Sequence, residues 1–550
     1  MSEQETEEGR QYGIGTYLGI GIVIILVIVG FLLVIPSGGI DTKVITSDSE
    51  SVEVEQAVKV FNMPLGTNSS DVITVPWKNS DLGLMHRGLF LADSAFESTR
   101  PDLAESLEIS RDGLTYTIQM KEGIKWSDGM DLTIDDVIFS FEWVLLADAV
   151  NGLYTTAFLN IEGASEYQEN PSIGLAGVMA EDNTLIIQLN TPYPALEQVL
   201  AQFTILPKHV LEETDMLLIN DNEEYWANPI VCGMYQVDKV ELVSEGSITL
   251  VQNQYYEGVK PQIEEVVFLS NASDFDYIAT NNIEEIISYR AISKLEEYQI
   301  DVLFYRYFIF NMSGVDGVEN TAMQDPLVRK AIGYAINREE LLRKVYLNTG
   351  TLINTGVPMS HSAYVDLDSD IEYNLEKAKE LLAQSQYDIN RPLRLTYYYS
   401  DDISMNFMEE VAANLKEVGF TVELFKVGAG SELYNEREYD LALKGLSAFS
   451  LLEWYAEYDD DNVNFKNIFG GTTDFEPYIN ALSSAVDPNE IDSILVELQN
   501  LEDELYFKVP LFTLNHSVFI NKEKVSIPTD VTFGNTFYRQ DVKFEEWTMK

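Results

Sequence analysis

The four histidines are the first side chains to test for catalysis, because His is a frequent general base and metal ligand. They are scattered along the chain, at His86, His209, His361 and His516. No G-x-S-x-G, H-E-x-x-H or P-loop motif accompanies them. The sequence therefore predicts no enzyme, and we expect no cofactor.

Two runs of aspartate have the composition of cation ligands. The first run places Asp at every second position from Asp366 to Asp370, as a calcium-binding EF-hand loop does. Ile371 stands where that loop needs Gly and Lys377 stands where it needs Glu, so we reject an EF-hand. The second run, Asp459 to Asp461, is more typical of solvated acids than of a cation site, and we expect no metal.

The charge of the chain is strongly negative. Its 550 residues include 90 Asp and Glu against 35 Lys and Arg, which gives a net charge of −55. Nucleic-acid binding is excluded as a function, because phosphate neutralisation needs clustered basic residues. The chain has a single cysteine, Cys232, so it cannot form an intrachain disulfide, and we expect a small buried side chain there.

The residues that could bind a ligand must be positioned by regular elements, and the clearest of these lie between 104 and 143. Apolar and polar residues alternate from Thr115 to Met120, which predicts a half-buried strand. Turns at Asp112-Gly113 and Asp128-Gly129 predict hairpins. A helix is predicted over Leu132 to Trp143, capped by Thr133 and with acids in its first turn.

A second region with mixed helices and strands begins near Tyr305. Asp325-Pro326 predicts the start of a helix, because Asp caps the helix and Pro is favoured at its first position. Residues 393–397 alternate as a strand, 403–415 carry a helical apolar stripe that Gly419 ends, and 420–424 alternate again. This strand–helix–strand unit predicts an α/β sheet.

An uncharged apolar segment runs from Gly13 to Pro36. As a helix it would cover roughly 36 Å at about 1.5 Å per residue, which is enough to cross a bilayer. A cleaved signal peptide is the alternative, but the apolar run is too long and no A-x-A site follows it. We therefore expect a retained membrane anchor, followed by a polar stalk.

Several segments in order resemble the family 5 extracellular solute-binding proteins, the oligopeptide and dipeptide receptors of ABC importers. They are AESLEISRDGLTYTIQMKEGIKWSDGMDLTIDDVIFSFEW (104–143), TPYPALEQVLAQFTILPKHVLEE (191–213), NPIVCGMYQVDKV (228–240), SITLVQNQYYEG (247–258), DPLVRKAIGYAINREELL (325–342) and NLEKAKELLAQS (374–385). Each pattern is weak alone, but their order and spacing are typical of the family.

The resemblance implies an α/β fold of two lobes that close like a clamp, as in periplasmic binding proteins, with an extra β-rich subdomain. Together with the membrane segment it predicts the following parts: a cytoplasmic N-terminus (1–12), a transmembrane anchor (13–36), a stalk (37–55), lobe I (56–79, 196–304 and 506–550), the extra subdomain of lobe I (80–195) and lobe II (305–505).

One segment departs from the family pattern, at 441–465. The family usually has a strand that ends in Gly-Trp, followed by an acid. Here Gly445-Leu446 occupies that place in one alignment, whereas Trp454 and Glu457 occupy the Trp and acid places in another. The family's early Leu-Asp-Pro turn is also missing before residue 85.

The resemblance implies a set of ligand-binding residues for an extended peptide held between the lobes. In the second alignment Glu457 would hold the α-ammonium, with Glu453 in reserve, and Trp454 and Tyr455 would line the pocket. Lys444 would meet a carboxylate. Cys232, Gly233 and Tyr235 lie in the segment that would present backbone groups to the ligand. For each residue a purely structural role is the alternative.

The resemblance thus implies a membrane-anchored, extracellular monomer that captures short peptides and delivers them to the permease of an ABC transporter. Domain closure around the ligand would be its mechanism. The alternatives are the same fold with a nickel chelate, haem or oligosaccharide as ligand, and a surface sensor or scaffold without a transport partner.

Overall fold

The computed structural model describes residues 58–65, 82–95, 98–147, 152–241, 246–270, 274–300, 303–315, 318–367, 372–536 and 538–550. The predicted N-terminus (1–12), membrane anchor (13–36) and stalk (37–55) lie outside these residues. Within the described ranges, no helix combines the length and the apolar character that a membrane crossing needs.

The first part of the described chain contains two four-stranded sheets. One has the order β4 (Ala104–Ile109), β5 (Thr115–Met120), β7 (Thr184–Gln188), β6 (Val178–Glu181), and the other has the order β1 (Val60–Pro64), β10 (Glu265–Leu269), β9 (Ser247–Gln252), β8 (Tyr235–Glu241). The predicted hairpin at Asp112-Gly113 is confirmed: β4 and β5 pair antiparallel, and Gly113 has a φ of +68° in the turn.

Helix α3 (Ile134–Leu146) follows the second Gly turn and begins after Thr133, as predicted. The backbone N–H of Thr133 donates to the Asp136 carboxylate at 2.8 Å, which is one half of a capping box. Val137, Phe141 and Val144 bury one face of the helix. The other elements of this part are β2 (Phe90–Ala92), β3 (Thr99–Pro101), α4 (Gly152–Leu159), α5 (Ala164–Glu169), η1 (Pro171–Ile173), α6 (Leu196–Gln202), α7 (Lys208–Leu211), η2 (Met216–Leu218) and α8 (Glu223–Ala227).

A six-stranded sheet forms the centre of the second part. Its order is β14 (Gly350–Leu352), β18 (Lys508–Leu514), β13 (Phe304–Phe310), β17 (Leu441–Ser447), β15 (Pro392–Tyr397), β16 (Thr421–Lys426). The predicted strand–helix–strand unit is confirmed, because β15 and β16 pair parallel and α14 (Asp402–Val418) connects them. Gly419 ends α14 with a φ of +117°.

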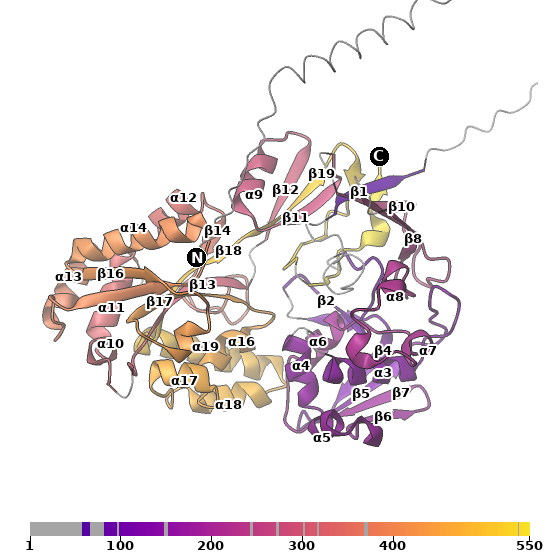
Figure 1. Ribbon diagram of the computed structural model, residues 1–550, viewed down its shortest axis with the longest axis horizontal. Helices are drawn as coiled ribbons and strands as arrows, with labels where there is room; N and C mark the ends of the chain where they lie inside the picture. The colour runs from indigo at the N-terminus through magenta and orange to yellow at the C-terminus, as the bar shows by residue number, and fades with distance from the viewer. Residues whose placement is uncertain are drawn as a thin grey trace, which may run out of the picture. The chain divides into compact units, whose positions relative to one another are not determined.

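Helices lie along both sides of this sheet, with α12 and α14 on one side and α17 to α19 on the other in Figure 1. The carboxylate of Asp325 accepts the N–H of Leu327 at 2.9 Å and caps α11, as predicted. The helices are α10 (Thr321–Gln324), α11 (Pro326–Ala335), α12 (Arg338–Val345), α13 (Leu375–Gln384), α15 (Glu432–Asn435), α16 (Leu451–Tyr455), η3 (Ala456–Tyr458), α17 (Val463–Phe469), α18 (Glu476–Ser484) and α19 (Pro488–Leu505).

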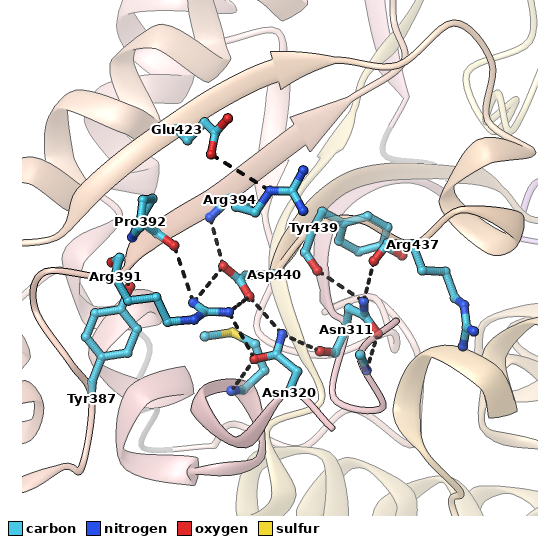
Figure 2. Close-up of polar contacts among 12 residues, drawn as sticks. Asn311, Asn320, Tyr387, Arg391, Pro392, Arg394, Glu423, Arg437, Tyr439 and Asp440 are labelled. Carbon is cyan, nitrogen blue, oxygen red and sulfur yellow. Dashed lines mark hydrogen bonds and ion pairs between the residues drawn. The ribbon is translucent and has the colours of Figure 1, made fainter. Parts of the chain in front are cut away.

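A buried polar network around Asp440 fixes the start of β17 (Figure 2). Asp440 is 1% exposed and accepts two hydrogen bonds from the guanidinium of Arg391, at 2.9 and 2.5 Å. Its carboxylate also accepts the side-chain amide of Asn320 at 2.7 Å and the backbone N–H of Arg394 at 2.8 Å. The network therefore ties β15 and β17 to the loop before α10.

Two strand connections link the sheets. β12 (Leu295–Ile300) continues towards β13, and β18 continues through Asn515 into β19 (His516–Asn521). β12 pairs with β19, and β13 pairs with β18, so the strands before and after each connection are paired. The remaining elements are β11 (Tyr277–Thr280), α9 (Ile283–Arg290), β20 (Val525–Ser526), η4 (Phe544–Glu546) and β21 (Thr548–Met549).

Two large hydrophobic cores divide these elements. One contains buried residues from 61 to 300 and from 518 to 547 together with Phe449, and the other contains buried residues from 283 to 514. We call the parts around them the first lobe and the second lobe. β18 packs in the second core, so the predicted return to lobe I at residue 506 comes too early; the return to the first lobe follows Leu514. The other domain limits stay predictions.

Candidate functional site

A pocket of about 370 Å³ lies between the two lobes. The first lobe contributes residues from the β2–β3 loop, β4, β5 and the start of α6. The second lobe contributes the loop 358–362, the segment 448–452 that follows β17, and the facing parts of α18 and α19. The volume falls within the range of small-molecule sites, about 300–1,000 Å³.

The walls of this pocket are mostly apolar, with two carboxylates from opposite lobes. Glu197 lies on α6 and accepts the hydroxyl of Thr99. Asp492 lies on α19 and accepts the hydroxyl of Ser362 at 2.8 Å. No Lys or Arg occurs among the described residues that line the pocket, and no ion pair within the described ranges involves either carboxylate. The pocket can therefore accept a cationic group.

The segment after β17 connects the pocket wall with both lobes. Phe449 belongs to the first hydrophobic core and packs edge-on against Tyr538, with ring centroids 5.0 Å apart. The carboxylate of Glu453 accepts the backbone N–H of Phe449. Burial raises the pKa of Glu453 to about 7, although hydrogen bonds from Phe449 and Ser450 oppose this shift. Glu453, predicted as the reserve anchor, thus lies beside the pocket lining at Ser450 to Leu452.

Glu457, the predicted ammonium anchor, lies within the second lobe and is 4% exposed. Its carboxylate forms ion pairs with Lys444 at 2.7 Å and with Lys508 at 2.9 Å, and it accepts the hydroxyl of Tyr307 at 2.6 Å. Burial opposes ionisation, but the two ammonium groups hold the pKa of Glu457 below its usual value. The structure therefore brings Glu457 and Lys444 together, as partners of each other.

Trp454 and Tyr455 are fully buried beside this ion-pair cluster. The Trp454 ring packs against Tyr305 and Tyr307, with centroids 4.7 and 4.8 Å apart. The indole N–H donates to Glu502 at 2.7 Å, and the Tyr455 hydroxyl donates to the same carboxylate at 3.1 Å. Neither ring lines the pocket between the lobes. Gly445-Leu446 lies inside β17, whereas Trp454 lies in α16.

Cys232, Gly233 and Tyr235 lie in the first lobe, away from the other predicted residues. Cys232 is 1% exposed, which agrees with a small buried side chain, and burial raises the pKa of its thiol to about 12. The N–H of Gly233 donates to the carbonyl of Met85 at 2.8 Å, and a Cβ at Gly233 would lie 2.5 Å from that carbonyl. Gly233 thus permits a close approach of two backbone segments. Tyr235 donates its hydroxyl to the Ile263 carbonyl at 2.9 Å.

Glu197 and Asp492 were not among the predicted ligand-binding residues. Glu197 lies near the start of α6, after Pro194, and Asp492 lies near the start of α19, after Pro488. Nothing in the local sequence indicates that these two helices face one pocket. The burial of Glu502 could have been predicted from the sequence, because it follows Leu495 and Leu498 at helical spacing on the apolar face of α19. Within the described ranges, no group of three or more His, Cys, Asp or Glu side chains could hold a metal ion.

Comparison with protein families gives a match over residues 98–476 to the bacterial extracellular solute-binding proteins, family 5 Middle. An oligopeptide-binding protein OppA from Lactococcus lactis subsp. cremoris is 23% identical over 377 residues, 63% of this chain and 62% of the relative. A Brucella ovis protein with the provisional name of an ABC transporter peptide-binding protein is 26% identical over 356 residues. The alignment spans 61% of the length of that relative.

Solved structures share this fold. The periplasmic murein tripeptide binding protein MppA, in an unliganded open form, has a TM-score of 0.71 at 18% identity, covering 90% of this chain and 98% of that one. Lactococcal OppA with an endogenous peptide in the closed conformation has a TM-score of 0.64 at 19% identity, covering 88% and 99%. NikA from Staphylococcus aureus with Ni(L-His)2 has a TM-score of 0.61 at 18% identity, covering 90% and 100%.

Proposed function

Because this chain belongs to the bacterial extracellular solute-binding proteins of family 5, we propose that it captures short peptides between its lobes and delivers them to an ABC transporter permease. A solute-binding protein holds its ligand without converting it, so the chain is not an enzyme. The observation that supports peptide capture best is the pocket of about 370 Å³ with walls from both lobes. A ligand that contacts both walls stabilises the closed arrangement more than the open one, and so shifts the population towards closure.

The chemistry of the walls favours a peptide with an uncompensated ammonium group and apolar side chains. Glu197 and Asp492 face the pocket from opposite lobes without a basic partner among the described residues. An α-ammonium or a lysine side chain can form charge-assisted hydrogen bonds with either of them. An acidic peptide would be disfavoured, because no Lys or Arg among the described lining residues could accept its carboxylates.

The residues predicted from the family pattern give a competing proposal for the anchor. A ligand ammonium at Glu457 would have to share one buried carboxylate with Lys444 and Lys508, or displace one of them. Removing a buried lysine from its partner is expensive, because an uncompensated charge remains. We therefore assign the anchoring role to Glu197 and Asp492, and keep Glu457 as the alternative.

The remaining parts of the proposal concern the position of the protein in the cell. We propose that residues 13–36 cross the membrane and hold residues 56–550 at the outer surface as a monomer, with 37–55 as a stalk. The support is the uncharged apolar run in the sequence. The strand pairs β12–β19 and β13–β18 would flank the hinge.

Mass spectrometry of small molecules released from the purified protein tests the function directly. We expect short peptides, and we expect added peptide to reduce the radius of gyration measured by X-ray scattering. Titration calorimetry with matched peptides then tests the anchor: a peptide with a free amino terminus should bind more tightly than its N-acetylated form. Equal affinities would reject the proposed ammonium anchor, and unchanged scattering with every peptide would reject peptide capture by closure.

A metal chelate is the second candidate ligand. His361 lines the pocket, and the Staphylococcus aureus structure with a related fold contains Ni(L-His)2. The same released material should then contain nickel in amounts equal to the protein, measured by elemental mass spectrometry. Nickel without peptide would favour the chelate, and peptide without nickel would exclude it.

A further inference from the structure

A second cavity of about 330 Å³ lies in the first lobe, away from the pocket between the lobes. Its lining comes from 82–91, 100–102, 121, 234, 256–258 and the C-terminal residues 539–545. The described lining includes no residue of the second lobe, so closure of the lobes would not cover it. Among the described residues, five basic side chains line this cavity, Arg87, Arg100, Lys121, Arg539 and Lys543, together with four acids, Asp102, Glu257, Asp541 and Glu545.

Three of these five basic side chains have carboxylate partners. The pairs are Arg87 with Asp102 at 2.6 Å and with Glu257 at 2.7 Å, Arg100 with Asp541 at 2.5 Å, and Lys543 with Asp530. Their charges are therefore already compensated within the protein. Arg539 and Lys121 are the basic groups left for a ligand, and the carboxylate of Glu545 is an acid of the same lining that an anion would have to avoid.

Arg539 is buried, at 2% exposure, and forms no ion pair with any described residue. Its Nε and Nη2 donate to the carbonyl of Ala201 at 3.2 and 2.7 Å, and Nη2 also donates to Phe203 at 3.2 Å. These carbonyls end α6, where the helix dipole is negative. Nη1 is buried and has no hydrogen-bond partner in the described part of the chain. Part of the guanidinium is thus left for another acceptor.

The carbonyl contacts hold the Arg539 side chain in place, but they do not compensate its positive charge. Burying an uncompensated guanidinium costs several kcal/mol in general, because carbonyl dipoles replace only part of the hydration that is lost. Burial accordingly lowers the pKa of Arg539. An anion bound in the cavity would supply the missing negative charge and acceptor oxygens for the N–H groups of Nη1.

Lys121 and His86 offer further donors on the same lining. The exposed Lys121 side chain has no ion pair with a described residue. His86 is buried, and burial together with the charge of Arg539 lowers its pKa to about 3. Its imidazole is therefore neutral near pH 7 and can donate one N–H to a ligand. A neutral His and two cations form a donor set that suits an oxyanion.

We propose that this cavity binds a small oxyanion, such as a phosphate or sulfate group, with Arg539, Lys121 and His86 as its donors. The site is independent of the peptide pocket. Its anion would connect the C-terminal segment 539–545 to the loops 82–91 and 256–258, all of which line the cavity. The cavity is also large enough for the ester of a phosphate with a small alcohol, so the source of the group is part of the test.

The experiment is titration calorimetry of the intact protein with sodium phosphate, sodium sulfate and glycerol 3-phosphate, each against sodium chloride at equal ionic strength. Matching the ionic strength matters because any salt screens the self-repulsion of a chain with a net charge of −55. We expect saturable binding of one oxyanion per chain and a higher melting temperature than in chloride. Tighter binding of glycerol 3-phosphate would identify an organic phosphate as the source, and equal or weaker binding an inorganic anion.

Variants link the binding to this cavity. Lys121→Gln should weaken binding about threefold, as expected for an exposed charge. Arg539→Met should weaken it at least about thirtyfold, because a buried charged hydrogen bond is lost. Lys377→Gln, an exposed lysine of α13 in the second lobe, is the matched control and should leave binding unchanged.

Since Arg539→Met also removes the contacts to α6, folding of this variant is checked by circular dichroism. If this variant does not fold, the proposal is tested by the affinity of Lys121→Gln compared with that of Lys377→Gln. No saturable heat for the unaltered protein, or equal weakening by both lysine variants, would overturn the proposal.

Discussion

Two regions of this protein contain carboxylates next to aromatic or apolar side chains, and they differ in what neutralises the charge. In the second lobe, Glu457 is surrounded by Lys444, Lys508 and Tyr307 from its own chain. In the pocket between the lobes, Glu197 and Asp492 have only hydroxyl partners among the described residues. The first arrangement uses its charge within the fold, whereas the second leaves its charge for a ligand.

The comparison shows that residue type does not distinguish a structural acid from a binding acid. Both regions combine acids with large apolar surfaces, and both lie near the segment 448–458. The difference lies in strand β18, which supplies Lys508 to the Glu457 cluster from a distant part of the sequence. Variants in the two regions should therefore change different quantities: stability in the first, affinity in the second.

The largest expected effect is on stability and comes from Lys508→Met. Lys508 is 1% exposed at its side chain, pairs with Glu457, and lies 4.1 Å from the centre of the Trp454 ring. Removing one partner of a buried ion pair leaves the other charge poorly compensated, so the free energy of unfolding should fall by about 3–5 kcal/mol. Urea denaturation followed by circular dichroism measures this change.

Lys522→Met is the control for that variant, because Lys522 is exposed and forms no ion pair with a described residue. Its effect should stay within about 0.5 kcal/mol. If Lys508→Met costs no more than the control, the Glu457 cluster does not stabilise the second lobe, and the contrast between the two regions fails.

The second expected effect is on affinity and comes from Asp492→Asn. The amide keeps the hydrogen bond with Ser362 as an acceptor, but it cannot compensate an ammonium. Peptide binding should weaken by about 1.5–3 kcal/mol, the usual value for a hydrogen bond to a charged group. Titration calorimetry with one peptide measures it, and Glu497→Gln on the exposed face of α19 is the matched control. An unchanged dissociation constant for Asp492→Asn would remove this carboxylate from the site.

The third expected effect concerns Glu453, whose position between the two regions makes stability depend on pH. Its folded pKa of about 7 lies above the ordinary 4.5, so the folded state binds the proton more tightly. Protonated Glu453 therefore stabilises the folded state relative to the unfolded state. This stabilisation is fully present below pH 4.5 and is lost as the pH rises through 7. Between about pH 5 and pH 8, the unaltered protein should lose about 2 kcal/mol more than Glu453→Gln does.

Comparison with the variant is necessary because the many other acids also titrate over this range. The free energy of unfolding of both proteins is therefore measured across the same buffers. If the two curves run parallel, Glu453 is ionised in the folded state and the pocket wall is more hydrated than its burial indicates.

Much of the fold could be predicted from local sequence patterns. The hairpin at Asp112-Gly113, the start of α3 after Thr133 and the unit β15–α14–β16 depend on turn residues, caps and periodicity, which act within a few residues. The family was also predicted correctly from six ordered segments. The assignment of β18 to the second lobe could not be predicted this way, because strand pairing with β13 joins residues about 200 positions apart.

The candidate site could be predicted only in part. Local patterns indicated a buried Cys232, and the structure has it buried. They could not indicate that Lys508 neutralises Glu457, because that contact depends on how β18 packs against η3. Nor could they indicate that Glu197 and Asp492 face one pocket, since 295 positions separate them in sequence. Contacts between lobes depend on tertiary geometry that no short pattern encodes.

The smallest expected effect gives the sharpest test of the comparison, and it comes from Glu457→Gln measured on peptide affinity. If Glu457 holds the ligand ammonium, as the family pattern implies, the dissociation constant should rise by the equivalent of about 1.5–3 kcal/mol. With Lys444 and Lys508 already paired to this carboxylate, we expect a change below about 0.5 kcal/mol, together with a loss of stability. Calorimetry with a known folded fraction separates the two effects. A large loss of affinity would move the anchor into the second lobe, because a ligand would then have to displace a lysine from Glu457 on binding.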